Sequence, residues 1–342
     1  MRAVAWLGDQ RYEATDIAEP AVEPGRVVVR VEATSICGSD THLADFGFDP
    51  PVIPGHEAAG VVVAVGPGVD GVNEGEHVAL DPVQRCGKCS ACRSGIGHLC
   101  LHTRHLGLPG AGGTWADFVA VDAANAHRLP EGLNFDAAAL VEPVAVCLES
   151  FRRARFEPGQ RVLIVGDGPF GFLHAQLAAS LGAATTIVAG HHDQRLQRIA
   201  ATTSAVICNT TTRDLDTALA DATDDGRVDL AIEASGAGPS PGACLAALRP
   251  RGTAVLFSYV WHPEPLDLGA IHMNELNVLG ACRSAGEYPH CLDLIARGDV
   301  DTSALVDRVC PLSEAPTALA ELPRIKSSVF KIVLHPEVSN GS

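Results

Sequence analysis

Four cysteines in one glycine-containing run have the spacing that most clearly permits chemistry. The run CGKCSACRSGIGHLC holds Cys86, Cys89, Cys92 and Cys100. Two-residue gaps let the thiolates converge on one ion while the glycines turn the backbone around it, as a closed tetrahedral zinc site requires. The alternative is a disulfide cluster, which needs an oxidising compartment. Because the opening MRAVAWLGDQRYEA lacks the pattern of a signal peptide, we interpret residues 86–100 as a structural zinc lobe.

A glycine-rich turn is suited to binding a phosphate. Gly166, Gly168 and Gly171, with Pro169 and Phe170 between them, follow the apolar run RVLIV and precede a helical stretch. Glycines allow a tight turn and a close approach of the backbone to a pyrophosphate, whose charge then lies at the helix N-terminus. A plain tight turn is the alternative, because this motif alone is a weak signal. Because the motif lies between a predicted strand and a predicted helix, we interpret it as a dinucleotide-binding turn.

A second set of possible metal ligands is scattered along the chain. Cys37 lies in ICGSDTH, His56 and Glu57 in PGHE, and Glu142 in VEPVAV. Thiolate, imidazole and carboxylate all bind zinc, and three protein ligands leave one position open for water or substrate. Each residue also has an ordinary alternative: a buried cysteine, a core histidine or a surface glutamate. Their separation in sequence does not decide between these interpretations.

The elements that must position these residues differ between the two halves of the chain. Residues 26–34 and 58–66 are β-branched runs bounded by proline or glycine, which predict short strands in a compact β-rich domain. From about residue 158, helical stretches alternate with strand-like segments at 161–165, 185–190, 228–236, 252–260 and 276–283. This alternation predicts an α/β fold with a doubly wound parallel sheet. A length of 342 residues suits two domains.

The composition excludes several kinds of partner. A content of 46% hydrophobic and 19% charged residues is typical of a globular protein, and we find no apolar run of the ~20 residues that span a bilayer. A net charge of −16 repels phosphate backbones, so we expect no nucleic-acid partner and no membrane partner. Eleven cysteines, an odd number, suit a reducing cytoplasm better than a disulfide framework.

The order of the motifs resembles the zinc-dependent medium-chain dehydrogenase/reductase superfamily over nearly the whole chain. The sequence is most similar to the polyol and threonine dehydrogenase branch, because Glu142 stands where liver-type alcohol dehydrogenases have a second cysteine ligand. The resemblance implies a GroES-like catalytic domain at 1–150, a Rossmann domain at 151–286 and a segment at 287–342 that returns to the first domain. It also implies hydride transfer between a nicotinamide cofactor and a secondary alcohol of polyol, sugar or amino-alcohol type.

The resemblance assigns roles around one catalytic zinc, in addition to the structural one. Cys37 and His56 match two ligands, and either Glu57 or Glu142 matches the third, depending on the family member. The other matches are Asp40 for the carboxylate that orients the histidine, Ser39 and His42 for a proton relay, Arg283 for a substrate contact and Lys331 for a contact with the cofactor pyrophosphate. The short stretch FGFDPPVIP trims a loop at the substrate pocket, so the exact substrate stays open.

The same resemblance leaves two alternative functions open and implies that copies of the chain associate. A zinc-independent quinone or enoyl reductase of the superfamily would have no use for Cys37, His56 and Glu142 together. A non-catalytic cofactor-binding protein would not need the relay residues. Family members are commonly homodimers or homotetramers joined at a Rossmann sheet edge, for which segments 252–260 and 276–283 are candidates.

The end of the second Rossmann strand predicts the choice of cofactor. Enzymes that prefer NAD place an acid there, which receives the ribose hydroxyls and repels a 2′-phosphate. Here Gly190 takes that position, followed by His191 and His192 with Arg195 one turn later, which favours NADP(H). Asp193 is the only nearby acid in this segment, and we expect it to cap the following helix. The alternative is NAD(H) with its ribose held by backbone groups.

Overall fold

The computed structural model describes residues 1–325 and 327–337, which form two compact units. Unit 1 combines Met1–Ala145 with Ser284–Ser342, and unit 2 is Val146–Arg283. The chain leaves unit 1 within helix α3 (Val141–Ala154) and returns after strand β15 (Asn277–Gly280). Both ends of the sequence therefore build one unit, and unit 2 is a continuous insertion in it.

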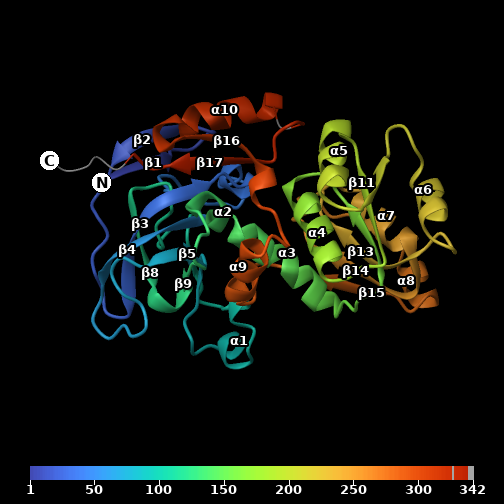
Figure 1. Ribbon diagram of the computed structural model, residues 1–342, viewed down its shortest axis with the longest axis horizontal. Helices are drawn as coiled ribbons and strands as arrows, with labels where there is room; N and C mark the ends of the chain where they lie inside the picture. The colour runs from blue at the N-terminus through green and yellow to red at the C-terminus, as the bar shows by residue number, and fades with distance from the viewer. Residues whose placement is uncertain (326, 338–342) are drawn as a thin grey trace. The chain divides into compact units, whose positions relative to one another are not determined.

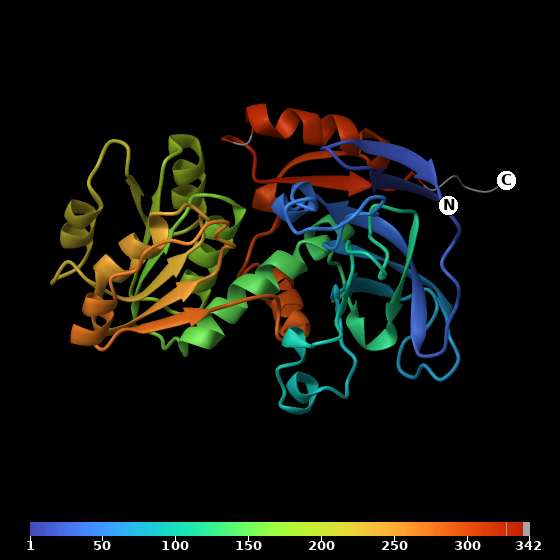
Figure 2. The same ribbon diagram turned by 180° about the vertical axis from the view of Figure 1, so that it is seen from behind.

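A mostly antiparallel sheet forms the centre of unit 1, in the order β16-β17-β3-β4-β5-β9 with β8 also paired to β3. Its strands are β3 (Arg26–Ser35), β4 (Ala58–Val65), β5 (His77–Leu80), β8 (Phe118–Asp122), β9 (Ala126–Arg128), β16 (Val306–Pro311) and β17 (Lys331–His335). Alternate residues Val27, Val29 and Val31 of β3 are buried in one apolar cluster, as the β-branched run predicted. Strand β17 pairs with β3 through Val333 and Leu334, so the C-terminal segment lies beside the N-terminal part of the unit (Figure 2).

Shorter elements complete unit 1. Two small sheets pair β1 (Arg2–Trp6) with β2 (Tyr12–Asp16), and β6 (Val83–Gln84) with β7 (Arg104–His105). The helices are α1 (Ser90–Arg93), α2 (Phe135–Ala139), α9 (Tyr288–Ala296) and α10 (Ala315–Ile325), with 3-10 turns η1 (Gly38–Thr41), η2 (Gly97–Leu99), η3 (Ala123–Asn125), η4 (Ser303–Leu305) and η5 (Leu312–Glu314). Trp6, Tyr12 and Trp115 belong to a second apolar cluster, which also takes in residues of α10 and β17.

Unit 2 is a parallel sheet in the order β12-β11-β10-β13-β14-β15, with helices on both faces (Figure 1). The strands are β10 (Arg161–Val165), β11 (Thr185–Gly190), β12 (Val206–Asn209), β13 (Val228–Glu233), β14 (Leu248–Leu256) and β15, and the helices are α4 (Pro169–Ser180), α5 (Asp193–Thr202), α6 (Leu215–Ala222), α7 (Ser240–Ala247) and α8 (Leu268–Met273). The strand order reverses between β10 and β13, where sheets of this kind bind ligands at their carboxyl ends. None of the described helices in either unit is long and apolar enough to cross a membrane.

The sequence predicted the α/β class of unit 2 but erred twice on strand β14, in its bounds and in its position in the sheet. The α/β class is confirmed, and β10 and β11 have the predicted bounds. Strand β14 begins at Leu248 and ends at Leu256, earlier than the predicted 252–260, because Leu248 already pairs with Val228 of β13, before a register shift that leads to the pair of Thr253 with Leu230. It lies between β13 and β15, so the prediction that it forms an edge is wrong, whereas β15 does lie at an edge.

Candidate metal centres and nucleotide-binding turn

Three of the predicted zinc ligands come together in unit 1. Cys37 follows β3, whereas His56 and Glu57 directly precede β4, so the antiparallel pairing of β3 with β4 brings the two segments side by side. One donor atom from each of the three residues lies within 4.8 Å of the others, and all three residues are buried. A thiolate, an imidazole and a carboxylate at this spacing fit a zinc ion.

Asp40, in the 3-10 turn η1, contacts both Cys37 and His56 of this cluster. Its Oδ2 accepts a hydrogen bond from the backbone N of Cys37 at 2.9 Å, and its Oδ1 accepts one from Gly55 N at 3.2 Å. The same Oδ1 lies 3.5 Å from His56 Nδ1. Burial alone would lower the pKa of His56, but the Asp40 carboxylate leaves that pKa well above its usual value. A carboxylate behind a metal-binding imidazole fixes the orientation of the ring.

Lys331 is the partner of Glu57, a contact that the sequence analysis missed. Its ammonium Nζ lies 2.6 Å from Glu57 Oε2 and also contacts Oε1 and the carbonyl of Ile36. The Ser35 hydroxyl donates to the same carboxylate. Burial would raise the pKa of Glu57, but Lys331 holds it below its ordinary value. A lone lysine in the apolar strand KIVLH was a usable signal, because a buried charge requires a partner.

Glu142 contributes a second carboxyl group to the surroundings of the cluster. It lies in the first turn of α3 and is buried, so the surface interpretation is wrong for Glu142 as it is for Glu57. Burial raises the pKa of Glu142 to about 7, although the nearby positive charge of His56 opposes this effect. Glu142 stands outside the set of donor atoms that lie within 4.8 Å of one another, which is Cys37, His56 and Glu57.

The predicted relay residues and the two predicted contact residues have different surroundings. Ser39 is half-buried in η1, and its backbone carbonyl accepts from His42 N at 3.0 Å. The His42 side chain is 43% exposed, and its Nδ1 lies 2.7 Å from Asp45 Oδ2. Arg283 belongs to unit 2 and adopts a φ of +62°. Its contact with substrate, like that of Lys331 with a pyrophosphate, stays a prediction.

The four cysteines of residues 86–100 converge as the spacing predicted. One sulfur from each lies within 4.8 Å of the others, with Cys89 Sγ 3.5 Å from Cys92 Sγ and 3.8 Å from Cys100 Sγ. These separations are far longer than the ~2.05 Å of a disulfide. They match the edge of a tetrahedron with metal–sulfur bonds of ~2.3 Å, which is about 3.8 Å. Backbone N–H groups of Cys92 and Leu101 lower the pKa of Cys89 to about 6, which favours the thiolate that a metal binds.

The glycine turn has the predicted strand, turn and helix context. Gly166 follows β10 with a φ of +136°, and Pro169 is the first residue of α4. A Cβ on Gly171 would lie 1.9 Å from the carbonyl oxygen of Gly166, so only glycine fits there. Phe170 packs its ring 4.9 Å from that of Phe257. This geometry is suited to a pyrophosphate at the N-terminus of α4.

The corner at the end of β11 differs from the prediction. Asp167, inside the glycine turn, accepts hydrogen bonds at Oδ2 from the backbone N of His191 and of His192, each at 2.7 Å. The prediction that Asp193 is the only nearby acid is therefore wrong, and the preference for NADP(H) loses its main ground. The predicted capping role of Asp193 is also wrong, because His192 is the N-cap and Asp193 Oδ1 instead accepts from Asn209 Nδ2 at 2.6 Å.

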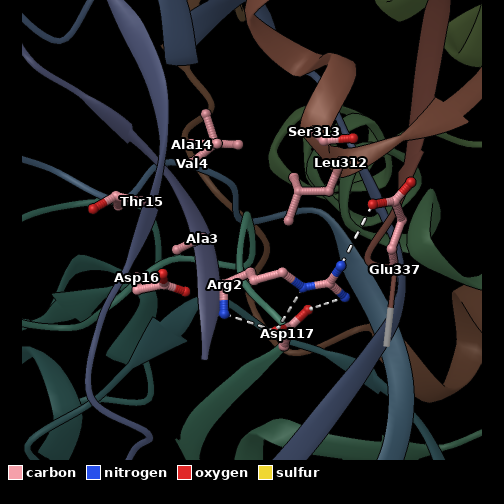
Figure 3. A pocket seen from close by; sticks show the side chains of 10 residues that line it. All are labelled: Arg2, Ala3, Val4, Ala14, Thr15, Asp16, Asp117, Leu312, Ser313 and Glu337. Carbon is pink, nitrogen blue, oxygen red and sulfur yellow. Dashed lines mark hydrogen bonds and ion pairs between the residues drawn. The ribbon is translucent and has the colours of Figure 1, made fainter. Parts of the chain in front are cut away.

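A separate hollow of about 300 Å³ opens in unit 1, lined by Arg2, Ala3, Val4, Ala14, Thr15, Asp16, Asp117, Leu312, Ser313 and Glu337 (Figure 3). Arg2 crosses it and pairs with Asp117 at 3.3 Å and with Glu337 at 3.4 Å. None of the predicted site residues lines this hollow. Arg2, Asp117 and Glu337 hold one another in place, and we assign the hollow no chemistry.

Comparisons with known proteins match segments of both units to dehydrogenase families. Residues 23–131 match the family described as alcohol dehydrogenase GroES-like domain, and residues 169–297 match the family described as zinc-binding dehydrogenase. The 2-dehydro-3-deoxy-L-galactonate 5-dehydrogenase of Pseudoalteromonas atlantica is 31% identical over 94% of this chain and 95% of its own. The first family match covers Cys37, His56, Glu57 and the four cysteines of residues 86–100, whereas the second begins at Pro169 and includes only Gly171 of the three glycines of the turn.

Two solved structures share the fold over nearly the whole chain. A zinc-binding dehydrogenase from Sinorhizobium meliloti 1021, bound to NADP, has a TM-score of 0.88 and 27% identity, and covers 98% of this chain and 99% of its own. A short chain alcohol dehydrogenase from Escherichia coli CFT073, complexed with NADH, has a TM-score of 0.92 and 25% identity with the same coverage. Proteins with this fold thus bind either nicotinamide dinucleotide.

Proposed function

This chain belongs to the family of zinc-binding, GroES-like alcohol dehydrogenases, and within it we propose that the chain oxidises a secondary alcohol of polyol or sugar type to a ketone. It is a zinc-dependent oxidoreductase that acts on alcohol groups and uses a nicotinamide cofactor. The observation that carries the proposal is the buried set of Cys37, His56 and Glu57 donor atoms within 4.8 Å of one another. The sugar-type substrate is suggested by the relative that acts on 2-dehydro-3-deoxy-L-galactonate.

We assign unit 1 to catalysis and unit 2 to the dinucleotide. Cys37, His56 and Glu57 would hold the catalytic zinc, and the four cysteines of residues 86–100 a structural one. Zinc held there would act as a Lewis acid toward the oxygen of an alcohol or a ketone. Glu57 is the more suitable third ligand, because one of its carboxylate oxygens lies within 4.8 Å of the donor atoms of Cys37 and His56. Glu142 would stand near these ligands, close enough to feel the charges of His56 and Glu57.

Ser39 of η1 and His42, which directly follows η1, would move the proton that leaves the alcohol. Ser39 lies two residues after Cys37 and is half-buried, whereas the His42 imidazole is 43% exposed. A hydroxyl group near the pocket and an imidazole open to water can pass a proton outward. Asp45, 2.7 Å from His42 Nδ1, would hold the ring in place. The nicotinamide would accept the hydride in the oxidation and return it in the reverse reaction.

The test combines zinc content with turnover on a panel of polyols, sugars, amino alcohols and aromatic alcohols, assayed with both cofactors. We expect about two zinc ions per chain in the wild type, and about one with no turnover in Cys37→Ser at unchanged circular dichroism. Cys282→Ser, at an exposed cysteine, is the matched control and should keep both ions. If Cys37→Ser kept more than about a tenth of the activity after loss of its metal, the zinc-independent alternative would replace the proposal.

We also propose that copies of the chain form a homodimer or homotetramer through the edge strand β15. An edge strand offers unpaired backbone groups to a second copy. Light scattering of the purified protein measures the number of copies. A monomer at micromolar concentration would contradict this part of the proposal.

A further inference from the structure

The carboxylate of Asp167 is held at a corner of unit 2 by groups that would otherwise suit a phosphate. Its Oδ2 accepts hydrogen bonds from two successive backbone N–H groups, those of His191 and His192, each at 2.7 Å. Its Oδ1 lies 3.1 Å from His192 Nδ1 and 3.6 Å from Arg195 Nη1. The Asp167 side chain is only 7% exposed. Two backbone donors, an imidazole and a guanidinium thus surround one internal anion.

The position of this carboxylate matches that of the acid missing from strand β11. A Cβ added to Gly190 would lie 2.4 Å from Asp167 Oδ2. The Asp167 carboxylate therefore fills the space in which a side chain at position 190 would begin. Gly190 is required here because any larger residue would collide with Asp167. The glycine turn after β10 supplies the carboxylate that the end of the neighbouring strand lacks.

The two possible cofactors present different groups to such a carboxylate. An unphosphorylated ribose offers hydroxyl groups, which can donate to a carboxylate oxygen. A 2′-phosphate would bring a second anion against Asp167, and like charges in contact cost several kcal/mol. Burial would raise the pKa of Asp167, but hydrogen bonds from His192 and His191 keep it below its ordinary value, so the carboxylate is charged at neutral pH. Phosphate binding would have to displace Asp167 from both backbone donors.

We propose that Asp167 selects the cofactor, and that it makes this enzyme prefer NAD(H) over NADP(H). The inference rests on the proposed dinucleotide function of unit 2. It reverses the preference that His191, His192 and Arg195 suggested in the sequence, because the His191 N–H, the His192 imidazole and the Arg195 guanidinium face an internal anion instead.

Binding measurements without substrate test this proposal. Titration calorimetry of the zinc-loaded protein would give dissociation constants for NADH, NADPH, ADP-ribose and 2′-phospho-ADP-ribose. We expect the wild type to bind each unphosphorylated ligand at least about tenfold more tightly than its phosphorylated partner. In Asp167→Asn and Asp167→Ser, that ratio should fall at least about tenfold, mainly because the phosphorylated ligands bind better. Asp193→Asn is the control. It removes an equal charge from a nearby carboxylate that contacts Asn209, and it should keep the wild-type ratio.

Each outcome bears on the proposal. A wild type that binds NADPH as tightly as NADH would overturn it, as would Asp167 variants that weaken all four ligands equally, since this would mean that Asp167 only shapes the turn. If Asp167→Ser fails to fold, the isosteric Asp167→Asn still reports the ratio. Binding of none of the four ligands would overturn the dinucleotide function of unit 2 itself. Selective binding without turnover would leave the selection by Asp167 intact and contradict only the catalytic proposal.

Discussion

Lys331 and Glu57 form an ion pair that water scarcely reaches, with side-chain exposures of 2% and 0%. Two opposite charges removed from water stabilise each other only while both are present. The pair joins the last strand of unit 1 to the residue that directly precedes β4. The sheet and the candidate zinc centre therefore depend on the same contact.

Lys331→Met should strongly destabilise unit 1. In the metal-free protein it leaves the Glu57 carboxylate buried without its partner, so we expect a loss of about 3–5 kcal/mol in the free energy of unfolding by urea. Arg128→Met is the matched control, because Arg128 pairs with Glu76 at the surface and its side chain is 66% exposed. The control should lose less than about 1 kcal/mol. If the two variants lost equal free energy of unfolding, the buried pair would contribute no more to stability than the surface pair.

The double variant Glu57→Gln with Lys331→Met separates the charge from the packing. Because it removes both charges, it should regain part of the stability lost in Lys331→Met alone. A double variant as unstable as the sum of the two single variants would mean that the charges do not interact.

The ligands of the candidate zinc centre were largely predictable from the sequence. The lysine that balances the charge of Glu57 was not. Cys37, His56 and Glu57 carry recognisable ligand atoms in recognisable motifs, and β3 and β4 have a clear β-branched pattern. Lys331 lies 274 residues from Glu57 along the chain, and only the pairing of β17 with β3 brings them together. No local pattern near Lys331 identifies that partner.

The surroundings of Gly190 also depend on a residue from a separate segment, which the local sequence does not identify. The strand, turn and helix there were predictable, because β10, β11 and α5 have strong local periodicity. Asp193, at the start of α5, is the acid that the local sequence offers near the end of β11. Asp167 lies 23 residues before Gly190, on the adjacent turn, and reaches the corner through space. Parallel strands bring the ends of separate segments together, so an acid on one segment can serve the other.

Cys100→Ser should lower the melting temperature before it affects the chemistry. One missing thiolate opens a closed four-sulfur site and frees the 86–100 segment, in which the apolar side chains of Ile96 and Leu99 are exposed. We expect a fall of at least about 5 °C in calorimetry and a zinc content that drops by about one ion per chain. Activity per folded molecule should change little, and Cys282→Ser should match the wild type. An unchanged melting temperature and zinc content would show that the four cysteines do not share an ion.

Two glycines of the same turn should respond differently to alanine. In Gly171→Ala the new methyl group would lie 1.9 Å from the Gly166 carbonyl oxygen, so we expect a loss of at least about 2 kcal/mol in stability. Gly168 has open space where a methyl group would stand and a φ of −77°, so Gly168→Ala should change stability by less than about 0.5 kcal/mol. It should nevertheless weaken binding of ADP-ribose, because the proposed pyrophosphate site requires a close approach to the backbone there. Equal stability of the two variants would contradict the close approach at Gly171.

His174 should make the protein less stable in mild acid. It is fully buried in α4, where its Nδ1 donates to the Phe170 carbonyl at 2.7 Å and its Nε2 lies 3.1 Å from the Ser150 hydroxyl. Burial lowers its pKa to about 4, against an ordinary value of 6.5. Between these values the unfolded chain binds a proton that the folded protein excludes. The stability that neutral His174 contributes is therefore complete above about pH 6.5 and is lost as the pH falls toward 4.

A comparison with His174→Gln isolates this contribution from other acid effects, including loss of metal. The free energy of unfolding of the wild type should fall relative to His174→Gln by about 2 kcal/mol between pH 7.5 and pH 5.0. His290→Gln, at an exposed histidine of α9, is the control and should follow the wild type at both pH values. The quantity to measure is the urea midpoint at each pH, since differences between variants cancel the effects they share. A constant difference between wild type and His174→Gln would mean that His174 takes up its proton without unfolding, which a fully enclosed imidazole should resist.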